Sequence, residues 1–82
     1  MNTTKKVIMY TTPTCVYCKM AKEFFTQHQI SYEELNVAED EKALEEMVRK
    51  SEQMGVPVID VGGEIFVGFD KRGIAKALGI SA

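Results

Sequence analysis

The stretch that decides the fold lies at residues 6–25 and reads KVIMYTTPTCVYCKMAKEFF. Its first part, Lys6–Tyr10, is a short apolar run rich in β-formers that stops at the Thr-Thr-Pro sequence of residues 11–13, which predicts a buried strand. From Cys15 to about Gln29 the apolar residues recur with helical spacing, which predicts a helix with Thr14 or Cys15 as its N-cap. The residues expected on the inward face of this helix are Met20, Ala21, Phe24 and Phe25.

The chain beyond this unit continues with strands and helices. The expected elements are a strand at Tyr32–Val37, a helix at Glu39–Ser51, a hairpin of Val58–Val61 and Glu64–Val67 about Gly62-Gly63, and a helix from the N-cap Asp70 to about Leu78, ended by Gly79. Because a helix separates the first two strands, they should pair in parallel through a right-handed crossover. The prediction is an α/β arrangement, a mixed four-stranded sheet flanked by three helices in the order βαβαββα.

The length and charge of the chain restrict its class. Its 82 residues, 45% of them hydrophobic, predict one small domain spanning 1–82. The net charge of −2 and the lack of a Lys/Arg cluster argue against a nucleic-acid partner. No apolar run approaches the ~18 residues of a membrane span, and the start has no apolar stretch typical of a signal peptide. We therefore expect a monomer in the cytoplasm, with no membrane partner.

The two cysteines, Cys15 and Cys18, fall at the junction between the first strand and the first helix. The unpaired N–H groups and the dipole at a helix start stabilise a thiolate, and Lys19 and Lys22 would add modest positive potential. Cys15 lies at the helix end, whereas Cys18 lies one turn deeper and within its reach. The spacing predicts that Cys15 attacks a disulfide and that Cys18 then resolves the mixed disulfide.

Three other uses of the pair fit the sequence less well. A structural disulfide across so short a loop would constrain the unfolded chain very little. Zinc needs four ligands, and the only histidine, His28, is expected at the surface near the end of the helix. Burial of both cysteines as small apolar residues does not account for their spacing at a strand-to-helix junction. Redox chemistry is therefore the favoured interpretation.

Three segments together resemble the glutaredoxin family, within the thioredoxin-fold superfamily. They are Tyr10–Cys18 with the sequence YTTPTCVYC, Gln53–Val58 with QMGVPV, and Val67–Asp70 with VGFD. The similarity covers nearly all of the chain and implies a thiol–disulfide oxidoreductase that uses glutathione as co-substrate, with no bound metal or organic cofactor. The implied partners are glutathione, disulfide-bonded or glutathionylated proteins, and glutathione reductase.

The resemblance also implies how glutathione would be held. The Val56-Pro57 sequence alone favours an ordinary trans bond at the start of an edge strand. The family instead places a cis-proline beside the redox pair, and the backbone of the preceding residue pairs with an extended substrate. The segment at residues 68–70 would hold the γ-glutamyl end, with helix N–H groups on its carboxylate and Asp70 on its ammonium group. The residues implied in glutathione binding are Tyr17, Val56, Pro57, Gly68, Phe69 and Asp70.

Four positions depart from the family pattern. Val16 stands where proline is usual, Gly55 replaces a threonine, Lys71 replaces an acid, and Thr12 replaces a basic residue that meets the glycine carboxylate of glutathione. These departures keep a second function open, a redoxin recharged by thioredoxin reductase, as in electron donors of ribonucleotide reductase. Two further alternatives are an iron–sulfur carrier that shares a cluster across a dimer, and a binding module without catalysis.

Overall fold

The computed structural model describes residues 6–80, and its helices and strands follow the predicted order. The elements are β1 (Val7–Thr11), α1 (Val16–Gln27), β2 (Glu33–Asn36), α2 (Glu41–Ser51), β3 (Val58–Val61), β4 (Glu64–Val67) and α3 (Lys71–Leu78). The boundaries differ from the predicted ones by up to two residues. The largest difference at a helix start is in α2, which begins at Glu41 because Asp40 is its N-cap.

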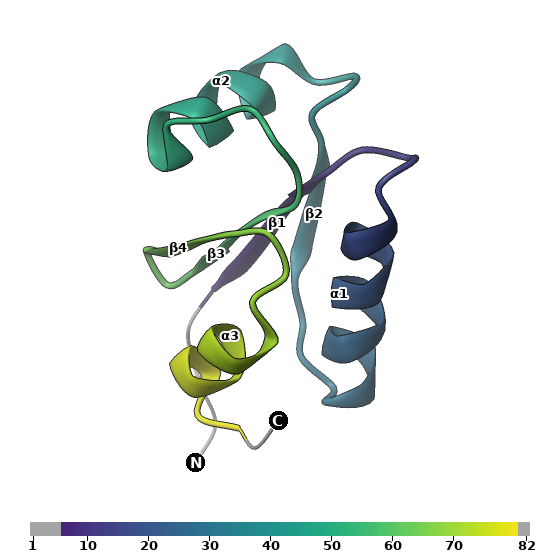
Figure 1. The fold of residues 1–82 in the computed structure, drawn as a ribbon, viewed down its shortest axis with the longest axis vertical. Helices are drawn as coiled ribbons and strands as arrows, with labels where there is room; N and C mark the ends of the chain where they lie inside the picture. Colours follow the sequence, from purple (N-terminus) through teal and green to yellow (C-terminus); the bar gives the residue numbers. More distant parts are fainter. Residues whose placement is uncertain (1–5, 81–82) are drawn as a thin grey trace.

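The four strands form one mixed sheet in the order β2-β1-β3-β4 (Figure 1). β1 pairs in parallel with β2 and antiparallel with β3, and the β3–β4 hairpin is antiparallel, as predicted. Thr11 was expected to stop the first strand, but it belongs to β1. It pairs with Asn36, and its carbonyl accepts a hydrogen bond of 2.9 Å from the N–H of Val37. Sheet pairing therefore carries β1 one residue closer to the cysteines than the β-propensity alone indicates.

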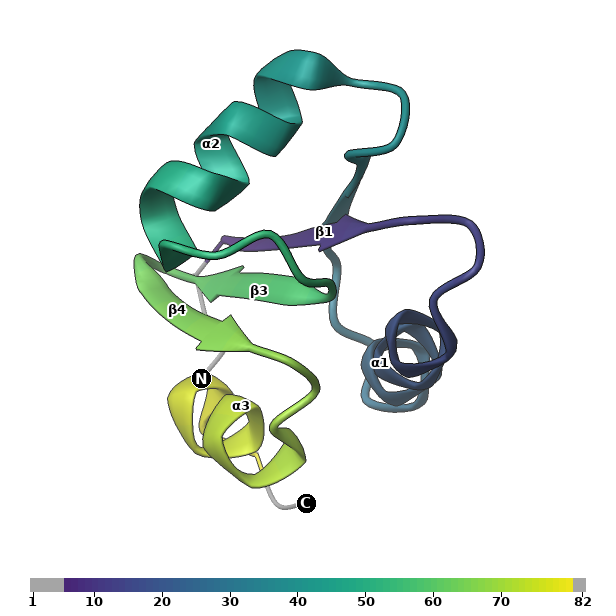
Figure 2. The ribbon, with the colours of Figure 1, turned by 45° about the horizontal axis from the view of Figure 1, so that its top comes forward.

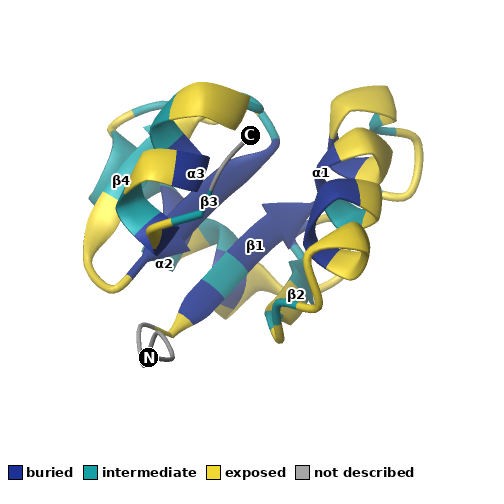
Figure 3. Ribbon diagram, turned by 90° about the horizontal axis from the view of Figure 1, so that it is seen from below, coloured by how far each residue is buried: buried dark blue, intermediate teal, exposed yellow. Residues whose placement is uncertain are grey.

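The helices lie on both faces of the sheet, α2 on one and α1 with α3 on the other (Figure 2). Alternate residues of the central strands supply the two cores, as the period of two in a strand requires. Val7 and Met9 of β1 join the core under α1 and α3, whereas Tyr10 joins the core under α2. Figure 3 shows the buried sides of α1 and α3 turned toward β1 and β3.

The inward face of α1 differs from the prediction at one position. Met20 is 45% exposed, whereas Cys18 is buried. The buried residues of this helix are Cys18, Ala21, Phe24 and Phe25. Each residue of a helix advances by about 100°, so a face centred on Ala21 includes the other buried residues within about 60° and places Met20 about 100° from its centre. The second cysteine thus occupies a core position that the pattern of large apolar residues did not indicate.

The N-cap of α2 should contribute measurably to the stability of the protein. The Asp40 Oδ1 atom accepts a hydrogen bond of 3.1 Å from the N–H of Ala43. Replacing Asp40 with alanine should lower the free energy of unfolding by about 1 kcal/mol, measured by urea denaturation. The neighbouring exposed residue Glu39 offers a matched control, because its side chain forms no hydrogen bond within residues 6–80, and Glu39→Ala should change stability by less than about 0.5 kcal/mol. Equal losses in the two variants would contradict the capping role.

Candidate active site

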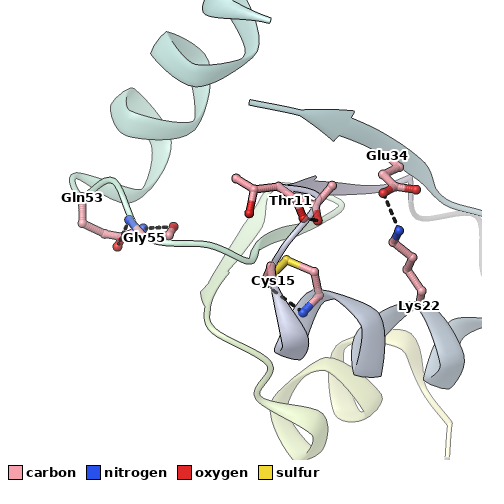
Figure 4. The surroundings of a disulfide bond; sticks show 8 residues. Thr11, Cys15, Lys22, Glu34, Gln53 and Gly55 are labelled. Atoms are coloured by element: carbon pink, nitrogen blue, oxygen red, sulfur yellow. Dashed lines mark hydrogen bonds and ion pairs between the residues drawn. A yellow bond between two sulfur atoms is a disulfide. The ribbon is translucent and has the colours of Figure 1, made fainter. Parts of the chain in front are cut away.

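The two cysteines form a disulfide at the start of α1, with their Cα atoms 5.2 Å apart (Figure 4). Cys15 is the N-cap, and its backbone is extended at φ −82° and ψ 114°. Its Sγ atom accepts a hydrogen bond of 3.1 Å from the backbone N–H of Cys18. The first of the two cysteines therefore lies where unpaired N–H groups of the helix converge, which stabilises a sulfur anion once the disulfide is reduced.

The two sulfur-bearing residues differ in exposure. Cys18 is 1% exposed, whereas Cys15 is only partly buried. The two residues between them, Val16 and Tyr17, are exposed by 68% and 61%. An incoming molecule can thus reach Cys15 from solvent, while Cys18 is reached through Cys15.

A shallow depression of about 210 Å³ opens beside the disulfide. It is lined by Thr12, Pro13, Thr14, Cys15, Val16, Cys18, Lys19 and Lys22. The two lysines do not contribute equally to its charge. Lys22 forms an ion pair of 2.7 Å with Glu34 of β2, whereas the exposed Lys19 has no ion pair within residues 6–80. The positive potential expected from both lysines therefore comes mainly from Lys19.

The loop before β3 brings a second candidate element to the site. The Val56–Pro57 peptide bond is cis, as the resemblance implied. Among the described residues, the backbone N–H and C=O of Val56 have no hydrogen-bond partner. The carbonyl of Pro57 accepts a hydrogen bond of 2.8 Å from the N–H of Gly68, which ties this loop to the segment that precedes α3.

The segment at residues 68–70 combines capping with packing. Asp70 is the N-cap of α3, and its Oδ1 atom accepts a hydrogen bond of 3.1 Å from the N–H of Gly73. The side chain of Phe69 packs against the core, with its ring 5.7 Å from that of Phe24. Packing therefore accounts for part of the Phe69 side chain, and the rest of it remains exposed. Tyr17 stands apart, because no hydrogen bond or ring contact joins its side chain to another described residue.

His28 lies at the surface, as expected from the sequence. It is the C-cap of α1, and its ring lies 4.6 Å from the ring of Phe24. Within residues 6–80, no three His, Cys, Asp or Glu side chains are grouped so that they could hold a metal ion. Nor is any helix in this part of the chain long and apolar enough to cross a membrane.

Two side-chain arrangements were not predicted from the sequence. Gln53 binds both the N–H and the C=O of Gly55 with its side-chain amide. On the α2 face of the sheet, the Nζ atom of Lys50 donates hydrogen bonds to Tyr10 (2.8 Å) and Asp60 (2.7 Å). The available signals were the QMGVPV segment for Gln53 and, for Lys50, an aspartate within the apolar run VIDV of residues 58–61.

The charged network changes the acid–base behaviour of two of its members. Burial alone would lower the pKa of Lys50, but hydrogen bonds to Asp60 and Tyr10 and the charge of Asp60 together raise it above its ordinary value. Burial raises the pKa of Tyr10, although the hydrogen bond from Lys50 opposes this change. Lys50 therefore stays charged at neutral pH while it bridges two residues of the central strands.

A mixed sheet whose first strand-to-helix junction carries Cys-x-x-Cys at the helix N-terminus defines the thioredoxin-fold thiol–disulfide redoxins. The family model named Glutaredoxin matches residues 7–67, and the chain belongs to the glutaredoxin family. It is 47% identical over 70 residues to an uncharacterised glutaredoxin-like 8.6 kDa protein from the rubredoxin operon of Clostridium pasteurianum, covering 85% of this chain and 93% of that protein. It is also 32% identical over 73 residues to the glutaredoxin-like protein NrdH of Lactococcus lactis, covering 85% and 96%.

Solved structures agree with this assignment. Methanoredoxin from Methanosarcina acetivorans superposes with a TM-score of 0.82 at 31% identity, covering 92% of this chain and 85% of that one. The glutaredoxin-like NrdH-redoxin from Escherichia coli, described as having a thioredoxin-like activity profile, gives a TM-score of 0.76 at 25% identity, covering 87% and 92%. The predicted thioredoxin fold and family are confirmed, and the chain is a glutaredoxin-like thiol–disulfide redoxin.

Proposed function

We propose that this chain reduces disulfides, with Cys15 as the attacking thiolate and Cys18 as the resolving thiol. In the reduced protein the Cys15 sulfur attacks one sulfur of a substrate disulfide and forms a mixed disulfide, and the other substrate sulfur leaves as a thiolate. Cys18 then attacks the Sγ atom of Cys15 and releases the second substrate thiolate. The substrate gains two electrons, and the pair becomes the Cys15–Cys18 disulfide. The observation that carries this assignment is the contrast in exposure between the two cysteines.

Glutathione is the proposed source of the electrons. Two glutathione thiols would return the pair to the dithiol and leave as glutathione disulfide. The unpaired backbone of Val56 supports an extended ligand, and Asp70, exposed at the start of α3, supports an ammonium group there. The N–H groups of Lys71 and Arg72 have no acceptor among the described residues and could bind the adjoining carboxylate. Such a cycle requires a reducing compartment, for which the cytoplasm is the proposed location.

Recharging by thioredoxin reductase is the second candidate. The similarity to NrdH proteins favours it, since one of them is described as having a thioredoxin-like activity profile. The departures at Thr12, Val16, Gly55 and Lys71 point the same way, because each removes a feature through which glutaredoxins hold or use glutathione. Under both candidates the substrates are proteins with disulfides, and glutathionylated proteins are added under the first.

The two electron sources can be separated by following NADPH consumption with a glutathionylated peptide as substrate. One reaction supplies glutathione with glutathione reductase, and the other supplies thioredoxin reductase alone. If glutathione is the reductant, Cys18→Ser should keep part of the turnover in the first reaction, since Cys15 can pass its glutathione directly to a second glutathione. Turnover confined to the second reaction, and abolished by Cys18→Ser, would reject glutathione and select the second candidate.

A further inference from the structure

We infer that Gln53 is a positioning residue, which holds the backbone of Val56 ready for a substrate by binding Gly55. The inference rests on the proposed function, because it takes Val56 as the backbone that pairs with the peptide part of a disulfide substrate. In this role Gln53 contacts no reacting atom.

The side chain of Gln53 closes on Gly55 through two hydrogen bonds (Figure 4). Its Oε1 atom accepts from the N–H of Gly55 at 2.7 Å, and its Nε2 atom donates to the C=O of Gly55 at 3.0 Å. A primary amide can bind the N–H and the C=O of one residue in this way because it carries a donor and an acceptor side by side. We call this pair of bonds the Gln53 clamp.

The clamp is anchored to the end of α2. The Nε2 atom of Gln53 also donates to the Oγ atom of Ser51 at 3.2 Å. The Ser51 hydroxyl in turn lies 2.7 Å from the carbonyl oxygen of Met47 and 3.1 Å from that of Gln53. These bonds fix the position of Gly55 relative to α2, whose Met47 side chain is fully buried in the core.

Gly55 is the residue type that leaves room for the clamp. Its φ angle is not positive, so a special backbone conformation does not explain the glycine. A Cβ atom at this position would lie 2.8 Å from the Oε1 atom of Gln53, closer than real Cβ contacts allow. That oxygen ends a flexible side chain, so Gly55→Ala would displace the amide and open the clamp with little other damage.

The clamp holds residues 54–56, the segment that precedes the cis proline. Within residues 6–80, every hydrogen bond of residues 54–56 involves Gln53, and the Met54 side chain between the clamped residues is 69% exposed. Without the clamp the backbone around Val56 would sample more conformations, and a ligand would have to order it on binding. Gln53 should therefore raise affinity for peptide disulfides without changing the sulfur chemistry.

Single-turnover kinetics of the pre-reduced protein test this inference without any electron-supplying enzyme. The probes are a short linear peptide linked as a disulfide dimer and the aromatic disulfide dithiobis(nitrobenzoate), which has no peptide backbone. Gln53→Ala should raise the half-saturating concentration of the peptide disulfide by about tenfold and leave its limiting rate unchanged. The rate with the aromatic disulfide should change by less than about twofold, because that probe makes no backbone pair.

Further variants distinguish positioning from a general structural role. Gln53→Glu keeps the acceptor but loses the donor and should give an intermediate effect, and Gly55→Ala should reproduce Gln53→Ala. The double variant should be no worse than either single one, because both remove the same contact. Gln27→Ala, in an exposed glutamine of α1, should leave both probes unaffected.

The outcomes separate the inference from the proposed function. Equal slowing of both probes, or no effect on either, would overturn the positioning role while leaving the reductase function in place. A wild-type protein that reduces neither probe would overturn the reductase function, and the positioning role with it. An increase in half-saturation confined to the peptide disulfide supports both.

Discussion

Replacing Cys15 with serine is expected to remove all measurable disulfide reduction, with either glutathione or thioredoxin reductase as the source of electrons. The loss should be at least about a thousandfold, because a serine hydroxyl is not ionised at neutral pH and cannot form the mixed disulfide. The effect should not arise from unfolding. Cys15→Ser and the reduced wild type both lack the Cys15–Cys18 disulfide, and serine is a good N-cap, so the two should unfold at nearly the same urea concentration.

Alkylation of the reduced protein provides an independent check on the same role. The wild type should take up one iodoacetamide group first, at Cys15, since Cys18 is 1% exposed beneath the start of α1. Peptide mass spectrometry after a short exposure would locate the modified residue, and Cys15→Ser should stay unmodified over that time. First modification at Cys18, or turnover that survives Cys15→Ser, would contradict the assignment of Cys15 as the attacking thiolate.

The outline of the fold and the redox pair could be predicted because their signals are local. A β-rich run, a Thr-Thr-Pro turn and a helical apolar face place Cys15 at the start of α1, and two adjacent glycines predict the β3–β4 hairpin. Both Gly62 and Gly63 have positive φ, as a tight hairpin turn requires. Each of these features depends on residues within a few positions of one another.

The remaining features depend on contacts that the local pattern does not encode. Cys18 occupies a core position because α1 packs on the sheet with that side inward, which leaves Met20 exposed. From the sequence, Lys50 is a positive charge that favours the dipole near the end of α2. In the structure it donates a hydrogen bond to Asp60, which faces α2 from a central strand. The cis form of the Val56–Pro57 bond was available only from the resemblance to a family, because most such bonds are trans.

The site and its support therefore come from opposite sides of the sheet. The attacking cysteine lies at the start of α1, which covers the same face of the sheet as α3. The clamp at Gln53 and the network at Lys50 both begin from the last turns of α2, on the other face. Correct docking of α2 thus matters to the position of the loop around Val56. Within residues 6–80, the side-chain hydrogen bonds of Lys50 to Tyr10 and Asp60 join this helix to the central strands.

Replacing Lys50 with methionine is expected to destabilise the protein by about 3 kcal/mol, because it leaves the charge of Asp60 buried without its partner. The Asp60 side chain is only 10% exposed, and the 2.7 Å ion pair to Lys50 is its sole ion pair within residues 6–80. The value lies at the lower end of the usual range, since the Lys50 side chain is 25% exposed and Asp60 keeps a hydrogen bond from Gly63. Urea denaturation of the reduced proteins would measure the loss.

Lys42→Met is the matched control, because Lys42 lies exposed on the same helix without an ion pair in the described part of the chain, and its loss should change stability by less than about 0.5 kcal/mol. Adding Asp60→Asn to Lys50→Met should recover part of the stability, because no unpaired charge then remains.

The pKa of Lys50 is raised above 10.5 in the folded protein, so the ion pair stabilises fully below that pH and is lost as pH rises further. The stability difference between wild type and Lys50→Met should consequently be constant from about pH 6 to pH 9 and shrink at higher pH. A loss no larger than that of Lys42→Met would mean that solvent, not Lys50, balances the charge of Asp60.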